Sequence, residues 1–160
     1  MPRRTTAPER SFERGLRALA AGETLEALAY FEVSMRLDEK TPNAARRARY
    51  VSYYGYCLAA ALGRTREGLS ICRKAAQSEF FTPDILLNLA RVHILAGKRK
   101  EAYETLMQGL RVDPEHSGLR AEVLKMGVRR RPVIPFLERS HPLNRIAGKL
   151  AVSGSRRKKK

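Results

Sequence analysis

The sequence predicts an all-α protein built from stacked helical hairpins. Gly22, Gly63 and Gly97 each separate two apolar stretches with helical periodicity. The residues five positions after these glycines are small, those nine positions after are larger, and those twelve positions after are small again. These nine residues are Ala27, Phe31, Ser34, Gly68, Cys72, Ala75, Ala102, Leu106 and Gly109. One register that holds three times indicates an internal repeat.

The repeated pattern is typical of two helices that pack closely across a tight turn. Glycine permits the turn because it adopts positive φ without steric cost. The small residue lets the second helix approach the first, and the larger residue fills the gap between them. Gly15, Tyr56 and Ala90 occupy the equivalent position seven residues before each glycine. Asp113-Pro114 closes the third hairpin, because proline cannot continue a helix.

The individual helices follow from this periodicity and from turn residues. We predict helices at 9–20, 24–38, 43–62, 66–78, 83–96 and 99–112. Thr82-Pro83-Asp84 is a start signal for the fifth helix, with proline in the first turn. A seventh helix is expected at 117–126, with Ser117 as its N-cap and Gly127 at its end. Its role would be to cover the last apolar face of the stack.

The pattern resembles the tetratricopeptide repeat (TPR), a helix-turn-helix unit of about 34 residues with alternating small and large packing positions. The resemblance covers residues 8–116 and implies a right-handed superhelix with a concave groove lined by the first helix of each repeat. Gly63 and Gly97 are 34 residues apart, whereas Gly22 and Gly63 are 41 apart. Seven extra residues therefore fall at the junction around Thr41-Pro42-Asn43.

Several residues depart from the pattern of the family. Arg14 stands where leucine is usual, and His93 stands where tyrosine is usual. Gly68 and Cys72 replace the expected alanine and aromatic residue of the second repeat. The third repeat matches the pattern most fully.

The resemblance implies a non-catalytic adaptor or scaffold that binds a protein segment in its groove. By register with the family, the groove residues are Tyr50, Tyr53, Tyr54, Asp84, Leu87, Asn88 and Arg91. Tyrosines supply rigid amphipathic contact area, although some of them can equally pack against neighbouring helices. Some members hold a partner's terminal carboxylate with Lys and Asn, but the matching positions here are Phe12, Leu16 and Asp84. We therefore expect no such clamp.

Neither catalysis nor a cofactor is predicted. His93, His116 and His141 have no metal-ligand spacing, and no glycine-rich phosphate loop is present. Cys57 and Cys72 are expected to be small core residues in a reducing compartment. No apolar run is long enough to span a membrane, and no apolar segment follows the basic start, so we expect a cytoplasmic protein.

Charge and proline content divide the chain. We expect a disordered stretch at 1–7, three hairpins with a capping helix at 8–127, a proline-interrupted segment at 128–150 and a flexible basic tail at 151–160. The net charge is +16, and residues 127–160 hold eleven Lys and Arg against one Glu.

The proline-interrupted segment reads as a docking peptide. Residues 132–137 are expected to be extended, and residues 142–150 to form a short helix that needs a surface. The apolar docking residues are Val133, Ile134, Phe136, Leu137, Leu143, Ile146 and Leu150. Self-docking on the chain's own domain is favoured by tethering. Docking on another macromolecule and simple disorder are the alternatives.

The last basic run could bind phosphate or anionic lipid without sequence preference, or could simply be solvated. It comprises Arg156, Arg157, Lys158, Lys159 and Lys160. The alternative function is therefore an RNA- or ribosome-associated protein that uses this tail. Self-association through an uncovered repeat edge is a third hypothesis.

Overall fold

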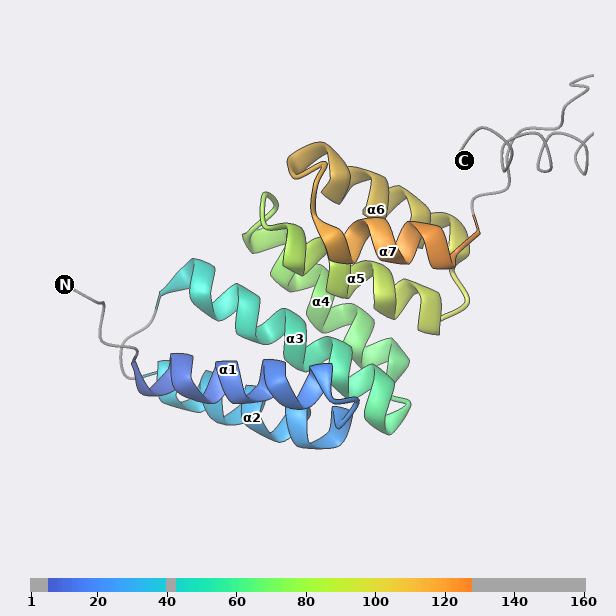
Figure 1. Ribbon diagram of the computed structural model, residues 1–160. Helices are drawn as coiled ribbons and strands as arrows, with labels where there is room; N and C mark the ends of the chain where they lie inside the picture. The colour runs from blue at the N-terminus through green and yellow to red at the C-terminus, as the bar shows by residue number, and fades with distance from the viewer. Residues whose placement is uncertain (1–5, 40–42, 128–160) are drawn as a thin grey trace, which may run out of the picture. The chain divides into compact units, whose positions relative to one another are not determined.

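The computed structural model describes residues 6–39 and 43–127, which form seven helices and no strand (Figure 1). The helices are α1 (Ala7–Ala20), α2 (Thr24–Asp38), α3 (Ala44–Leu62), α4 (Thr65–Ser78), α5 (Pro83–Leu95), α6 (Arg99–Val112) and α7 (Ser117–Lys125). The all-α prediction is confirmed for this part of the chain. Each helix begins and ends within two residues of its predicted bounds.

Polar side chains fix where the helices begin. The carboxylate of Glu9 accepts hydrogen bonds from the Thr6 amide at 2.7 Å and from the Thr6 hydroxyl at 2.9 Å, so α1 begins at Ala7, earlier than predicted. Asn43 Oδ1 accepts from the Arg46 amide at 2.9 Å at the start of α3. At α7 the prediction of Ser117 as N-cap is wrong. His116 is the N-cap, since its Nδ1 accepts from the backbone of α7.

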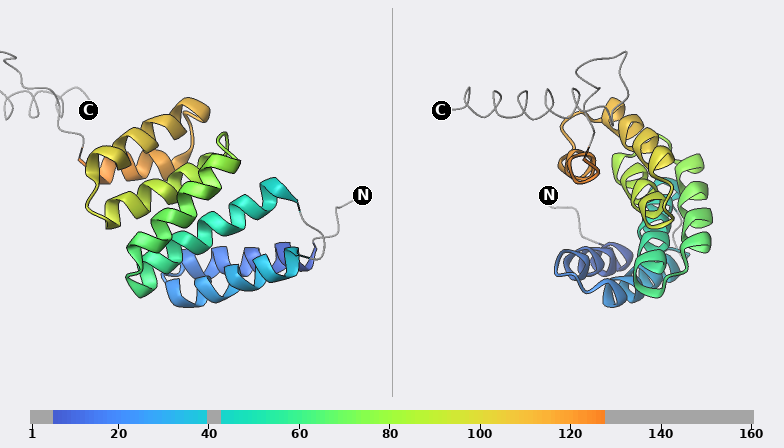
Figure 2. Two further views of the ribbon diagram at one scale, coloured as in Figure 1. Left: turned by 180° about the vertical axis from the view of Figure 1, so that it is seen from behind. Right: turned by 90° about the vertical axis from the view of Figure 1, so that its right-hand side faces the viewer.

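Consecutive helices pair into three hairpins, α1 with α2, α3 with α4, and α5 with α6. Gly22, Gly63 and Gly97 form the turns with φ of +85°, +67° and +71°, values that glycine adopts at low cost. α3 packs on α2 and on α5, while α7 packs on α5 and α6. In the right-hand view of Figure 2 the helices follow a curve, with α4 and α6 on its outer side and α1 and α7 facing one another across its inner side.

All nine residues of the repeated register are buried, which explains the pattern physically. A Cβ added to Gly15 would lie 2.6 Å from the Phe31 ring, so a larger residue would separate α1 from α2. The second hairpin departs from the register by one position. Gly55, not Tyr56, faces Cys72, and an added Cβ at Gly55 would lie 2.9 Å from the Cys72 sulfur.

The core of the described residues consists of three apolar clusters. One lies between the first and second hairpins, one between the second and third, and one between the third hairpin and α7. Cys57 and Cys72 are buried within them as free thiols, in agreement with their predicted role as small core residues. Burial raises the pKa of each thiol to about 12. Leu119 of α7 is fully buried against the last hairpin, so α7 does cover an apolar face.

α3 is the longest helix, with 19 residues, and its first turn binds the first hairpin. Arg46 Nη2 lies 2.6 Å from Asp38 Oδ1 at the end of α2, and Arg46 Nη1 lies 3.9 Å from Glu9 Oε1 on α1. Asp38 is fully buried. The hydrogen bond with Asp38 raises the pKa of the Arg46 guanidinium, so this contact is held as an ion pair.

Two groups of predicted features lie outside the described residues. They are the docking segment within 128–150 and the polyanion-binding run at 156–160. His141 also lies outside the described residues. Within the described chain, no helix is long and apolar enough to cross a membrane.

Candidate partner-binding surface

The inner side of the curve is formed by α1, α3, α5 and α7 (Figure 2), and it carries a cavity between α1 and α3. The cavity has a volume of about 800 Å³. Its lining residues are Glu9, Phe12, Glu13, Leu16, Asn43, Ala45, Arg46, Arg49, Tyr50 and Thr82. Four of these side chains are charged, so the cavity suits a polar occupant with an apolar contact near Leu16.

Aromatic rings form the base of this surface. Phe12 lies against Phe31, Tyr50 and Tyr53, with ring centroids 5.4, 4.7 and 5.2 Å apart. The Arg49 guanidinium carbon lies 5.0 Å from the centroid of the Phe12 ring, a cation–π contact. Burial raises the pKa of Tyr50 and of Tyr53 to about 12, which keeps both phenols protonated. The cluster therefore holds α1, α2 and α3 together.

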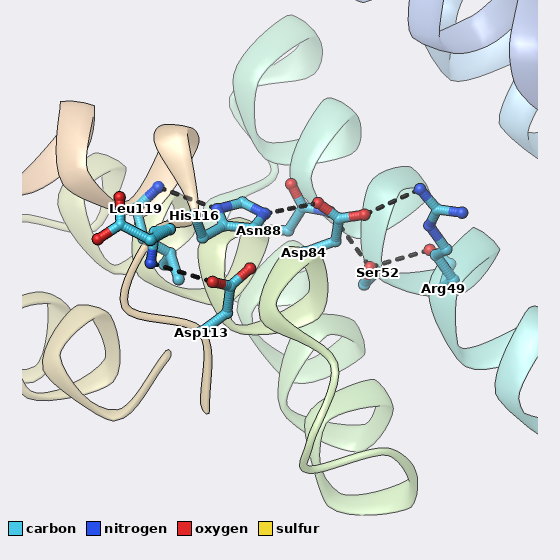
Figure 3. Close-up of polar contacts among 8 residues, drawn as sticks. Arg49, Ser52, Asp84, Asn88, Asp113, His116 and Leu119 are labelled. Carbon is cyan, nitrogen blue, oxygen red and sulfur yellow. Dashed lines mark hydrogen bonds and ion pairs between the residues drawn. The ribbon is translucent and has the colours of Figure 1, made fainter. Parts of the chain in front are cut away.

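A chain of polar contacts crosses the inner surface from α3 to α7 (Figure 3). Arg49 Nη2 donates to Asp84 Oδ2 at 2.9 Å, and the other carboxylate oxygen lies 3.2 Å from His116 Nε2. His116 Nδ1 accepts from the Leu119 amide at 3.2 Å. Because Nδ1 accepts, the ring proton is on Nε2, which donates to Asp84. One carboxylate thus connects three helices.

A second polar group connects α5 to α7 closer to the end of α7. Arg91 Nε donates to Glu122 Oε1 at 3.1 Å, and the Arg91 guanidinium lies 5.3 Å from the centre of the Tyr56 ring. Lys125 Nζ lies 3.3 Å from the same Glu122 oxygen. Arg91 is partly exposed, so it can hold α7 and still face a bound molecule.

The seven predicted groove residues divide between the core and the surface. Tyr50, Tyr53, Leu87 and Asn88 are buried. Tyr54, Asp84 and Arg91 are partly exposed. Tyr50 and Tyr53 pack against Phe12, and Asn88 Nδ2 donates to Ser52 Oγ at 3.2 Å inside the structure (Figure 3).

The four buried groove residues are covered for the same physical reason. The inner faces of α3 and α5 are partly covered by neighbouring helices, since α2 and α5 pack on α3 and α7 packs on α5. A position on the first helix of a hairpin is therefore not by itself a surface position. Tyr54, Asp84 and Arg91 remain the predicted residues that a partner can reach without rearrangement.

Sequence reasoning missed Arg49 and His116 as parts of this surface. Arg49 precedes Tyr53 by one helical turn, so the same register that selected the tyrosine could have found it. His116 was assigned to no site because its partner, Asp84, is 32 residues away in the chain. Only packing of α7 on α5 brings the two together.

The titratable groups of the described chain show no arrangement for metal chemistry. Among residues 6–39 and 43–127, no group of three or more His, Cys, Asp or Glu side chains is placed to hold a metal ion. His93 is buried, and burial followed by the nearby Arg73 charge lowers its pKa. Its Nδ1 has no hydrogen-bond partner within the described chain.

No family model matches the chain, and no curated protein matches it.

Proposed function

We propose that this protein is a cytoplasmic, non-catalytic adaptor of the TPR type, whose inner surface binds a segment of another protein. Three hairpins with one repeated register of buried small and large residues support the TPR assignment. The cavity of about 800 Å³ between α1 and α3 is the observation that carries the binding role. A cavity of this size falls within the range of pockets that hold small ligands, so it can accept side chains of a bound segment.

The chemistry of the inner surface selects the kind of segment. Glu13 is exposed at the cavity, and Arg49 and Arg91 are partly exposed beside the polar contacts described above. A segment with charges of both signs and an apolar side chain directed at Leu16 fits this lining. Paired charges at such a surface determine orientation and specificity more than affinity.

A peptide selection on the full chain tests this proposal. A random peptide library is panned against the protein, and the binding site of each selected peptide is mapped by shifts of backbone amide resonances. We expect shifts in α1 and α3 around the cavity. Glu13→Lys should weaken binding about tenfold or more, while Glu26→Lys on the exposed face of α2 should leave it unchanged. Selected peptides that map elsewhere, or no peptide above background, would reject the proposal.

The alternative, an RNA- or ribosome-associated protein, is favoured by one observation. Residues 127–160 hold eleven basic side chains against one acidic side chain. Binding of a generic single-stranded RNA should then fall steeply between low and physiological salt, and deletion of residues 156–160 should remove most of it. A peptide interaction at the inner surface would survive this deletion, so the two functions separate.

The chain's own residues 129–150 are a further candidate for the inner surface. If they occupied it, they would compete with a selected peptide. The full chain carrying Val133→Ser and Phe136→Ser would then bind that peptide more tightly than the unchanged protein does. Equal affinity would show that the inner surface is open in the intact chain.

A further inference from the structure

A second hollow lies at the connection between α4 and α5, on the side of α6. It has a volume of about 960 Å³. Its lining residues are Phe80, Phe81, Tyr103, Glu104, Met107, Gln108, Arg111 and Val112. We name this hollow the aromatic groove. It differs from the inner cavity because three of its eight lining residues are aromatic and Met and Val extend its apolar surface.

The aromatic rings of this groove are exposed. Phe80 is 50% exposed and Phe81 is 77% exposed. Their centroids lie 5.4 Å apart with an interplanar angle of 80°, an edge-to-face pair. Exposure of adjacent phenylalanines is unfavourable in water, and apolar side chains gathered beside a hollow are typical of binding surfaces.

The groove runs along one face of α6. Tyr103, Met107 and Arg111 follow one another at intervals of four residues, so they share that face. The stripe spans about 12 Å at about 1.5 Å per residue. A segment that lies along it would pass from Tyr103 toward Arg111.

The described chain ends close to the start of this stripe. The guanidinium of Arg99, in the first turn of α6, donates through Nη2 to the Met126 carbonyl at 2.7 Å. Arg99 precedes Tyr103 by four residues, or about 6 Å along the helix axis. The Met126 carbonyl is therefore held by a side chain of the helix that lines the groove, one helical turn before Tyr103 in that helix.

The continuation has a sequence that fits an aromatic surface. Residues 132–137 read Pro-Val-Ile-Pro-Phe-Leu, with prolines three positions apart. Segments with this proline spacing bind aromatic-lined grooves as extended chains, and their prolines lose little conformational freedom on binding. The four residues 128–131 span up to about 13 Å when extended, which exceeds the roughly 6 Å that separates Arg99 from Tyr103 along the axis of α6.

We propose that residues 132–137 of the chain bind its own aromatic groove, against Phe80, Phe81, Tyr103 and Met107. Tethering through four residues gives the segment a local concentration on the order of millimolar, so modest complementarity suffices. The inner cavity is the less suitable place for this segment, because four charged side chains line it. Charged groups lose hydration against Val, Ile, Phe and Leu without a compensating partner. This proposal is independent of the inner-surface function and leaves that surface open.

A nitroxide spin label on the full chain locates the segment. Glu138→Cys places the label next to residues 132–137 without removing an apolar side chain. The native thiols of Cys57 and Cys72 are buried with pKa values of about 12, so they react slowly with the reagent. We expect strong broadening of the amide resonances of residues 103–111 and none in α1. Broadening in α1 or α3, or broadening nowhere in the described helices, would overturn the proposal.

Matched variants and dilution complete the test. Phe81→Ser should abolish the broadening, whereas Leu124→Ser, at a side chain that is 79% exposed on α7, should not. Both side chains are largely exposed, so neither change should unfold the helices.

Mixing the labelled chain with unlabelled, isotope-enriched chain shows whether the bound segment comes from the same chain or from a second copy. Broadening transferred to the enriched chain would assign the groove to a second copy and reject binding within one chain.

Discussion

Asp84 on α5 and His116 at the start of α7 are joined through Oδ1 and Nε2 at 3.2 Å, while the other Asp84 oxygen binds Arg49 of α3. The two contacts place Arg49 of the inner surface in the same hydrogen-bonded group as His116, the N-cap of α7. Occupation of the inner surface near Arg49 and attachment of α7 are therefore linked through one carboxylate.

Asp84→Ala should reduce the free energy of unfolding by about 1–2 kcal/mol, because it removes two charge-assisted contacts at a partly exposed site. Amide hydrogen exchange should rise selectively at Leu119 and the following turn of α7, where His116 would lose its orientation. Glu104→Ala is the control, since Glu104 makes an exposed pair with Lys100 at 4.0 Å. Equal exchange at α7 in both variants would show that the Asp84 contact does not hold this helix.

Tyr53→Ala should destabilise the fold by about 3–5 kcal/mol, as large-to-small changes of buried aromatic residues do. Tyr53 is 7% exposed and packs on Phe12 and Phe31. Tyr53→Phe keeps this packing and should cost much less. Urea unfolding followed by circular dichroism measures both, since the chain contains no tryptophan. A Tyr53→Ala variant as stable as Tyr54→Ala would contradict this account of the cluster.

Gly68→Ala should cost about 1–3 kcal/mol through overpacking. The new Cβ would lie 2.5 Å from the Gly55 carbonyl oxygen and 2.8 Å from Ala59 Cβ, so α3 and α4 must separate. Gly97→Ala tests a different cause. It meets open space but has φ of +71°, and the backbone strain should cost about 1 kcal/mol. A crystal structure of each variant would show helix separation at Gly68 and none at Gly97.

His93 should make stability depend on pH. Its pKa is lowered in the folded state from the ordinary 6.5, first by burial and then by Arg73, while Glu101 opposes the shift. Below 6.5 the unfolded chain therefore binds a proton more readily, and stability falls as the pH falls. His93→Phe should flatten the change in unfolding free energy between pH 7 and pH 5. An unchanged slope would assign the pH dependence to other groups.

The sequence predicted the helices well because their signals are local. The glycine turns, the small packing positions and the start of α5 at Pro83 all depend on residues close together in the chain. The N-cap of α7 was wrong because serine is the commoner cap, and the contact of His116 with distant Asp84 is invisible in one helix.

The candidate surface was less predictable. Tyr50 and Asn88 were assigned to a groove from their place in the repeat, but both are buried by neighbouring helices. Helical periodicity tells which residues share a face, and it does not tell how far the next hairpin covers that face. The aromatic groove was missed as well, although adjacent Phe80 and Phe81 before a proline-initiated helix were a visible signal.

The long third helix has a consequence for how the array melts. In a stack of repeats, each unit is coupled to its neighbours by an interface energy, and weak coupling lets single units fray. The first turn of α3 carries Arg46, whose contact with the fully buried Asp38 belongs to the boundary between the first two hairpins. Loss of the first hairpin would leave that arginine without its carboxylate. The buried ion pair therefore adds to the coupling between the first two hairpins and opposes fraying of α1 and α2 from the rest of the stack.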